Sequence, residues 1–408
     1  MSKEEEVIGL CSTMRLLQGI VCLDQSLPYV KAIIPLAAAL LSAAIFSIAI
    51  QLPYRARLVT TPFMIGAAAV AIRTNSYLLP FPHAPDILSQ VICVWSHHAL
   101  SVLLIEPVFI PPNSPPQQRQ RFIRKIWNDP RRLTTWESCE ESKESTSRLK
   151  FLEIAVRRML FYIALHRFFA AVKILVGPDN LMADDFAPIR RSFFRRMLHA
   201  YPEAPVTMRD LHIRAWVSVE WIWTSYIKIN TYNVLASIVF VVVLRFDSPE
   251  EWPDLFGSPL EAYSVQRFWG KFWHPLLRHP CAASGRLISR RLLRIPAGSR
   301  YERIWVVFWT FLVSGVDHAL VAHVISNGYS GFAADYLRYK LSHFAAGAIE
   351  MVLGPILEKK IRAHQDGPLG RIFANSLVRR LLGYLWVFMV FFCSKPHEQY
   401  ARLYINLR

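Results

Sequence analysis

Two histidines stand in segments where an ionisable side chain is out of place. His318 and its neighbour Asp317 interrupt the apolar stretch IWVVFWTFLVSGVDHALVAHVI at residues 304–325. His274 closes the aromatic run FWGKFWH at residues 268–274. Ionisable groups at membrane depth are costly, so they face a cavity or a partner group. An imidazole held in this way is suited to accept the proton of a hydroxyl group, as general-base catalysis requires.

The neighbours of His318 allow two interpretations. Ser314 lies one helical turn before His318 on the same face, and Gly315 lets another backbone or a substrate approach closely. His323 lies five positions further on, about 140° around the helix, so the two histidines are not expected to share a site. His318 could therefore carry reaction chemistry, or it could be a buried histidine that hydrogen-bonds to a neighbouring helix.

The aromatic run at residues 268–274 combines rings with cations. Trp269 and Trp273 lie close in sequence to three basic residues, which are Arg267, Lys271 and Arg278. Aromatic side chains at this density are typical of a membrane interface, where amphipathic rings tolerate both phases. The cations could bind an anion, or they could extend to the interface from an aromatic belt.

The composition excludes an ordinary soluble protein. Of 408 residues, 53% are hydrophobic and only 19% are charged, and the mean hydropathy is +0.25. Long apolar runs recur from end to end, which predicts an integral membrane protein. The net charge of +17 comes from basic residues between these runs, which favours a cytoplasmic membrane face and anionic phosphorylated ligands over nucleic acid. The six cysteines form no CxxC pair, so neither a disulfide framework nor a metal site is expected.

Apolar stretches of spanning or near-spanning length occur at residues 32–50, 58–79, 87–110, 152–176, 232–245, 304–326, 341–357 and 377–393. A bilayer core needs about 20 helical residues, so these stretches predict an all-α, polytopic membrane protein with about eight transmembrane helices. The preceding stretch 216–229 could extend 232–245 or form a further helix, which would change the number by one or two. We expect one domain over residues 1–408, with a motif core at 128–320 between N-terminal helices at 27–110 and C-terminal helices at 341–393.

Charge between the apolar stretches predicts their orientation. Four basic connections, at 51–57, 111–150, 246–303 and 358–376, fall on one side if eight spans alternate, and the positive-inside rule makes that side cytoplasmic. The segment RRSFFRR at 190–196 conflicts with this arrangement, unless it lies in the membrane interface. The N-terminus carries an acidic cluster and no A-x-A pattern, so no cleaved signal peptide is expected.

Several catalytic signatures are absent from the sequence. It contains no GxxxxGK[ST], GxGxxG, GxSxG, HExxH or HxxxD pattern, which disfavours nucleotide hydrolysis, dinucleotide redox chemistry and serine hydrolysis. A proton- or ion-coupled transporter using His318, Asp317 and Arg167 is an alternative. It predicts polar residues repeated at membrane depth or two similar halves, and neither stands out in the sequence.

Taken together, the two histidine segments resemble the membrane-bound O-acyltransferases, specifically their wax-synthase-like branch. Residues 268–274 resemble the motif FWG-x-x-WH of that branch, and FLVSGVDHAL at 311–320 resembles FL-[VI]-SG-x-x-H. NDPRRLTTWE at 128–137 is similar to N-x-RGIGT-x-W-E but lacks its glycines. Two further departures are Asp317, where the branch has an apolar residue, and Pro275, where it often has glutamine. A non-catalytic member of the family is disfavoured because both histidines are retained.

The resemblance implies a bundle around an internal reaction tunnel and assigns roles to its residues. His318 would be the catalytic base and His274 the second catalytic residue. We assign substrate contacts to Trp269, Trp273, Asp317 and Ser314, and coenzyme A contacts to Arg267, Lys271, Arg278 and Arg131. Acetyl-CoA or another acyl-CoA would be a co-substrate, so no bound cofactor and no metal is expected. Cys281 is expected to pack rather than to act as a nucleophile.

The resemblance also narrows the substrates. The context GSPLEAYSVQRFWGKFWH is similar to fungal secondary-metabolite acetyltransferases, which act on terpenoid, meroterpenoid or trichothecene alcohols. We therefore expect acetyl transfer to a hydroxyl group of a lipophilic, terpenoid-like acceptor in the endoplasmic reticulum membrane. Long-chain acyl transfer to an alcohol, as in wax synthases, is the alternative. The oligomeric state is left open.

Overall fold

The computed structural model describes residues 28–81, 83–134, 147–325, 330–363, 367 and 375–408. Within these ranges the chain folds into helices joined by turns, without a strand, which confirms the all-α prediction. The acidic N-terminus, Trp136 of the 128–137 motif and most of the polar stretch 137–147 lie outside the described residues.

The N-terminal part of the bundle contains α2 (Pro28–Lys31), α3 (Ile33–Ala49), α4 (Tyr54–Arg73), η1 (Asn75–Leu78), α5 (Ala84–Leu100), the π-helical turn η2 (Ser101–Ile105) and α6 (Pro116–Trp127). Phe46, Met64 and Val102 pack in its core. Arg57 holds the α3–α4 turn, because its buried guanidinium donates hydrogen bonds to the carbonyls of Ile50, Leu52 and Val108 at 2.8–3.0 Å. These backbone acceptors would otherwise be left unpaired near the helix ends.

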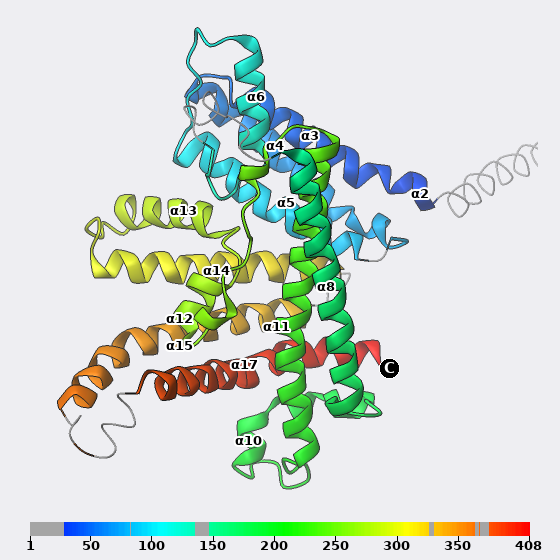
Figure 1. The fold of residues 1–408 in the computed structure, drawn as a ribbon, viewed down its shortest axis with the longest axis vertical. Helices are drawn as coiled ribbons and strands as arrows, with labels where there is room; N and C mark the ends of the chain where they lie inside the picture. Colours follow the sequence, from blue (N-terminus) through cyan, green and yellow to red (C-terminus); the bar gives the residue numbers. More distant parts are fainter. Residues whose placement is uncertain (1–27, 82, 135–146, 326–329, 364–366, 368–374) are drawn as a thin grey trace, which may run out of the picture.

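Two long helices run along the longest axis of the molecule (Figure 1). They are α8 (Arg148–Val176) and α11 (Met208–Ser237), the latter continued by the π-helical turn η4 (Ile238–Val243). Phe169 of α8 stacks against Trp216 and Trp223 of α11, with ring centroids 5.3 and 5.1 Å apart. The stretch 216–229 therefore belongs to the same helix as 232–243, and is not a separate one.

A second group of helices crosses the α8–α11 pair (Figure 1). It comprises α13 (Arg278–Arg291), α14 (Arg300–Ile325), α15 (Ser330–Ala363) and α17 (Ser376–Asn406). Gly315 allows α14 and α15 to approach closely, because a Cβ atom there would lie 3.0 Å from Leu337 Cδ1 and 3.3 Å from Lys340 Cβ. This contact lies within one turn of His318.

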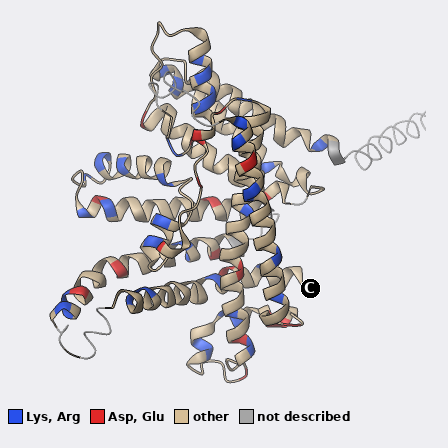
Figure 2. Cartoon of the chain, in the orientation of Figure 1, with Lys and Arg blue, Asp and Glu red and all other residues tan. Residues whose placement is uncertain are grey.

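Short elements connect these helices. They are η3 (Ala183–Phe186), α9 (Pro188–Arg191), α10 (Phe193–Met197), η5 (Pro249–Glu251), η6 (Pro259–Glu261), α12 (Val265–Arg267) and the π-helical turn η7 (Phe268–Phe272). Lys and Arg gather on α6, α13 and the end of α15 (Figure 2). All three regions fall in connections that the sequence predicts to be basic.

Six helices of the described residues are long and apolar enough to cross a membrane, so the expected number of eight is not confirmed. They span Tyr54–Arg73, Ala84–Ile105, Arg148–Val176, Met208–Val243, Arg300–Val324 and Ser376–Asn406. The expected span 32–50 becomes the 17-residue helix α3, which at 1.5 Å per residue is somewhat shorter than a bilayer core of about 30 Å. The expected span 341–357 lies within α15, whose apolar character is reduced by residues such as Lys340 and Glu350.

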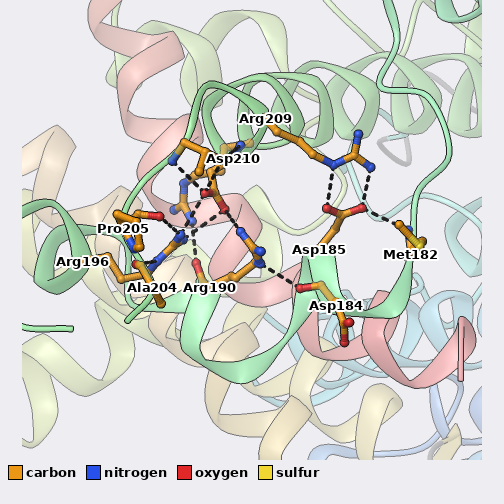
Figure 3. A network of polar contacts seen from close by, with 11 residues as sticks. Met182, Asp184, Asp185, Arg190, Arg196, Ala204, Pro205, Arg209 and Asp210 are labelled. Atoms are coloured by element: carbon orange, nitrogen blue, oxygen red, sulfur yellow. Dashed lines mark hydrogen bonds and ion pairs between the residues drawn. The ribbon is translucent and has the colours of Figure 1, made fainter. Parts of the chain in front are cut away.

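The segment 190–196 uses most of its cations inside the protein. Asp210 accepts hydrogen bonds from Arg190 at 2.8 Å and from Arg196 at 2.8 and 3.1 Å (Figure 3). Arg191 forms an ion pair with Asp335. These arginines therefore serve to hold the fold together, and the conflict of this segment with the positive-inside rule stays open.

Candidate active site

His318 lines a cavity of about 190 Å³ to which four helices besides its own contribute side chains. Asp86 and Gln90 come from α5, Trp221 and Lys228 from α11, and Val321 and Ala322 accompany His318 on α14; Tyr336, Tyr339 and Lys340 belong to α15, and Lys395 and Arg402 to α17. The imidazole is therefore open to an internal space in which small reactant groups can meet it. A histidine packed solidly between helices would offer no such access.

One polar contact and one aromatic contact hold the His318 ring. Its Nδ1 atom lies 3.1 Å from the amide nitrogen of Gln90, and its ring stacks on Tyr336 with centroids 5.7 Å apart and an interplanar angle of 11°. Nε2 makes no hydrogen bond within the described part of the chain. One ring nitrogen thus serves to orient the imidazole while the other is left for chemistry.

Two buried lysines give the cavity a positive character. Lys395 forms an ion pair with Glu398 one turn away, and its Nζ lies 4.1 Å from the centroid of the Trp221 ring. Lys340 Nζ lies 4.6 Å from the centroid of the Trp269 ring. Cations over aromatic faces are stabilised by the negative face of the ring, more so where water is excluded.

The aromatic run 268–274 forms the π-helical turn η7 and the extended residues after it. Phe268, Phe272 and Trp273 are buried and pack against Phe391 of α17. Arg278, at the start of α13, donates to the carbonyls of Trp269 and Gly270 at 3.2 and 2.9 Å. Arg278 thereby satisfies carbonyls that the short turn leaves unpaired.

Trp269 ties this turn to α15 and α17 through a chain of hydrogen bonds. Its Nε1–H donates to Nδ1 of His343 at 3.1 Å, and Nε2 of His343 lies 3.0 Å from the Ser394 hydroxyl. Because Nδ1 accepts, His343 carries its proton on Nε2 and donates toward Ser394, which in turn donates to the carbonyl of Val390 at 2.7 Å. A base facing Ser394 would need the opposite tautomer, so this group is a structural link and not an activated serine.

His274 lies near the cavity without lining it. Its ring contacts Phe256 and Trp273, with centroids 5.4 and 5.6 Å away, and its buried Nδ1 atom has no hydrogen-bond partner in the described residues. Burial, followed by the charges of Lys340 and Arg278, lowers the pKa of His274 to about 3. His274 is therefore uncharged at neutral pH. Both His274 and His318 lie close enough to Lys340 to feel the charge of its ammonium group.

The residues expected to contact substrate are placed differently from one another. Trp269 and Trp273 stand behind the cavity, where Trp269 supports Lys340 and Trp273 stacks on Trp221 at 5.1 Å. Asp317 points away from His318, and its carboxylate accepts a hydrogen bond from His97 of α5 at 3.0 Å. Ser314 is partly buried one turn before His318 and does not line the cavity.

The cations expected to bind coenzyme A do not gather around His318. Arg131 lines a separate cavity of about 110 Å³, formed by residues 125–134, Asn233, residues 247–255 and Leu276. Arg267 forms an ion pair with Glu261 and lies 4.4 Å from the centroid of the Tyr263 ring, whereas Lys271 is exposed. Among these four cations, Arg278 alone lies close enough to interact electrostatically with His274, and it also lies near Arg131.

Four residues of the site were missed by sequence reasoning. They are Gln90, Lys340, His343 and Lys395. Lys340 and Lys395 lie immediately outside the expected spans 341–357 and 377–393, so a search for ionisable groups at the edges of these spans would have found them. Gln90 is uncharged and carries no comparable signal.

The described residues contain no group of three or more His, Cys, Asp and Glu side chains arranged to hold a metal ion. The chemistry that the site offers comes from an imidazole, three ammonium groups, a guanidinium, a carboxylate and two phenols around one cavity. Such a set can move a proton and stabilise negative charge.

Comparison with known proteins concerns the part of the chain that contains His274 and His318. Residues 252–337, which include both histidine motifs, match the family model described as membrane bound O-acyl transferase family. The predicted resemblance to membrane-bound O-acyltransferases is confirmed. The match covers residues 252–337 only, and no solved structure matches the chain. The six apolar helices that are long enough to cross a membrane are those of a multi-pass membrane protein.

The relatives that this chain resembles are fungal proteins named as acetyltransferases. Acetyltransferase atnC of Arthrinium sp is 32% identical over 206 residues, covering 49% of this chain and 43% of the relative. Acetyltransferase TRI7 of Fusarium sporotrichioides is 30% identical over 191 residues, covering 45% and 40%. Acetyltransferase aurG of Calcarisporium arbuscula is 26% identical over 278 residues, covering 66% and 61%. The first two matches thus span less than half the length of those relatives.

Proposed function

We propose that the chain is an O-acetyltransferase of the endoplasmic reticulum membrane that transfers acetyl from acetyl-CoA to a hydroxyl group of a lipophilic, terpenoid-like alcohol. One observation carries the proposal: the His318 imidazole opens onto an internal cavity between the helices. The acetyltransferase names of the fungal relatives support acetyl as the transferred group. Because a bilayer dissolves lipophilic alcohols, an enzyme embedded in it has direct access to such an acceptor.

The reaction needs a base because a neutral hydroxyl attacks a thioester slowly. His318 Nε2 takes the hydroxyl proton as the alcohol oxygen bonds to the thioester carbonyl carbon. The tetrahedral intermediate then collapses, the carbon–sulfur bond breaks, and the proton passes from the imidazolium to the departing thiolate of coenzyme A. General-base help contributes about 10²- to 10⁴-fold in rate, and orientation of the two substrates adds to it.

His274 serves as the second catalytic residue in this proposal. It is uncharged at neutral pH, and its unpaired Nδ1 can either donate or accept, depending on the tautomer. With a proton on Nδ1 it donates to an oxygen of the acyl group and orients the thioester. Arg131, Arg278, Lys271 and Arg267 lie on connecting segments, where they attract the phosphates of coenzyme A.

The test uses the full-length protein in lipid nanodiscs, with labelled acetyl-CoA and a panel of hydroxylated terpenoids. Wild type is expected to form the O-acetyl product, and His318→Ala to lose at least about 100-fold in kcat, as loss of a general base implies. His323→Ala is the matched control, because this exposed histidine lies on the same helix. Equal rates for wild type and His318→Ala would reject His318 as the base. Palmitoyl-CoA in parallel distinguishes acetyl transfer from the wax-synthase alternative.

A further inference from the structure

Lys340 is a buried cation that lacks a negative partner. Its residue is only 5% exposed, and no carboxylate of the described chain lies within ion-pair distance of Nζ. Nζ also makes no hydrogen bond to an oxygen within the same residues. The nearby Lys395, by contrast, is paired with Glu398. An unpaired buried ammonium is energetically unfavourable, so its presence calls for a reason beyond stability.

Lys340 lies in the wall of the cavity that His318 lines, between this cavity and Trp269. Nζ rests 4.6 Å from the ring centroid of Trp269, and the side chain lines the same cavity as His318. Tyr336 precedes Lys340 by four residues on the same face of α15, and the His318 ring stacks on Tyr336. The helix face that holds the base therefore also presents the cation.

Gly315 makes this arrangement sterically feasible. A Cβ atom at this position would meet Lys340 Cβ at 3.3 Å and Leu337 Cδ1 at 3.0 Å, so a larger residue would force these side chains to shift. Gly315 stands in the motif that contains His318, three residues before it. The close packing of the two helices thus sets the position of Lys340 relative to the base.

We propose that Lys340 is a further catalytic residue, whose ammonium stabilises the oxyanion that forms on the acyl carbonyl during attack by the alcohol. This inference rests on the proposed function. The carbonyl oxygen gains its charge when the alcohol oxygen bonds to the carbon, and loses it when the thiolate of coenzyme A departs; Lys340 keeps its proton throughout. A preorganised charge in a water-poor site supplies such stabilisation without reorganisation, because the donor is already in place.

Three variants test the inference in nanodiscs. Lys340→Met keeps the size of the side chain and removes its charge, Lys340→Ala leaves space for a small amine, and Lys359→Ala removes an exposed cation of the same helix that does not line the cavity. Both Lys340 variants are expected to lose about 10²- to 10³-fold in kcat, the range found on removing one oxyanion donor. KM for acetyl-CoA should change less than about threefold, because the charge acts in the transition state. Lys359→Ala should stay within about threefold of wild type.

Two further readouts separate catalysis from structure. Added ethylammonium should restore part of the O-acetyl product with Lys340→Ala and none with Lys340→Met, and Lys340→Met should melt at or above the wild-type temperature because it removes an unpaired buried charge. A kcat near that of wild type, a loss without amine rescue, or a lower melting temperature that accounts for the lost activity would overturn the inference. If wild type transfers acetyl and Lys340→Ala keeps a normal kcat, only the catalytic role of Lys340 is rejected. If wild type itself is inactive, the proposed function is rejected too.

Discussion

The amide nitrogen of Gln90 lies 3.1 Å from Nδ1 of His318, although the two residues are 228 positions apart in the sequence. A carboxamide can present either its nitrogen or its oxygen to an imidazole, because the two are exchanged by a rotation of the group. When the oxygen faces Nδ1, the ring proton sits on Nδ1 and Nε2 keeps its lone pair. Only that tautomer lets Nε2 accept a proton, whereas the amide nitrogen facing Nδ1 would hold the proton on Nε2. Gln90 thus selects the state of His318 that acts as a base when its amide turns its oxygen toward Nδ1.

Replacing Gln90 by Leu is therefore expected to lower kcat by about 10- to 100-fold, the range seen when the partner of a ligating histidine is removed. Gln90→Glu offers only acceptor oxygens, so it should hold the proton on Nδ1 and retain more activity than Gln90→Leu. Steady-state kinetics with acetyl-CoA measure both variants. A Gln90→Leu enzyme as active as wild type would show that His318 is oriented without this hydrogen bond.

Local sequence patterns predict much of this fold, because membrane helices can be recognised from the length and apolar character of a sequence stretch. All six candidate spans coincide with stretches found in the sequence. The stretches 32–50 and 341–357 mark real helices, but the first is short for a bilayer and the second extends into charged residues. Length and mean apolarity alone do not distinguish these cases, because they do not tell whether a helix faces lipid or protein.

The lining of the cavity is harder to predict, because it depends on which helices meet. Adjacency to His318 suggested a substrate contact for Asp317, yet consecutive helical residues point about 100° apart. Asp317 accordingly faces α5 while His318 faces the cavity. Trp269 and Trp273 were predicted to contact substrate. In the structure they pack behind cavity residues that come from other helices, Trp269 against Lys340 and Trp273 against Trp221.

The pair formed by Asp317 and His97 links α14 to α5, with 3.0 Å between the carboxylate and Nε2. We expect Asp317→Ala and His97→Ala each to destabilise the protein, and the double variant to lose less than the sum. A coupling of about 0.5–3 kcal/mol is usual for side chains in direct contact. Unfolding in mixed micelles measures it, and KM for the acceptor should be unchanged in Asp317→Ala. A raised KM with normal stability would restore Asp317 to the substrate site.

Asp210 is the centre of the ion network in Figure 3. It accepts hydrogen bonds from Arg190 and Arg196, and also from the backbone and the hydroxyl of Thr207 at the start of α11. Asp210→Ala leaves the buried guanidinium of Arg196 without its counter-charge, which costs about 3–5 kcal/mol. Thermal unfolding should show a large drop in melting temperature. Asp184→Asn is the control, because this exposed side chain lies in the same region, and it should change stability by at most about 0.5 kcal/mol.

Cys281 lies seven residues after His274 and is fully buried in α13. Burial, reinforced by the charge of Asp317, raises the pKa of its thiol to about 12. The thiolate is the nucleophilic form, so an acyl-enzyme on Cys281 is not expected at neutral pH. Cys281→Ala should keep kcat within about threefold of wild type. Mass spectrometry should detect no acetylated Cys281 after incubation with acetyl-CoA, and a covalent adduct there would contradict the direct transfer that we propose.

Asp247, which lines the smaller cavity, makes the stability of the protein depend on pH. It is 8% exposed, and its carboxylate accepts a hydrogen bond from Trp252 at 3.0 Å. Burial, which outweighs that hydrogen bond, raises the pKa of Asp247 from 3.8 to about 6. The folded state thus prefers the protonated acid. Compared with a variant that has a neutral side chain at this position, the folded protein is most stable below pH 4. Its free energy of unfolding falls as the pH rises to about 6, and above that pH the full cost of the buried charge persists.

Asp247→Asn isolates this effect, because an amide oxygen still accepts from Trp252 and carries no charge. The free energy of unfolding of wild type, measured relative to Asp247→Asn, should fall by up to roughly 3 kcal/mol between pH 4 and pH 6.5, at about 1.36 kcal/mol for each unit of pKa shift. Unfolding in mixed micelles at several pH values measures the difference, and the other titrating groups cancel because both proteins share them. A difference that stays constant over this range, or that grows in favour of wild type as the pH rises, would mean that Asp247 is ionised in the folded protein at little cost.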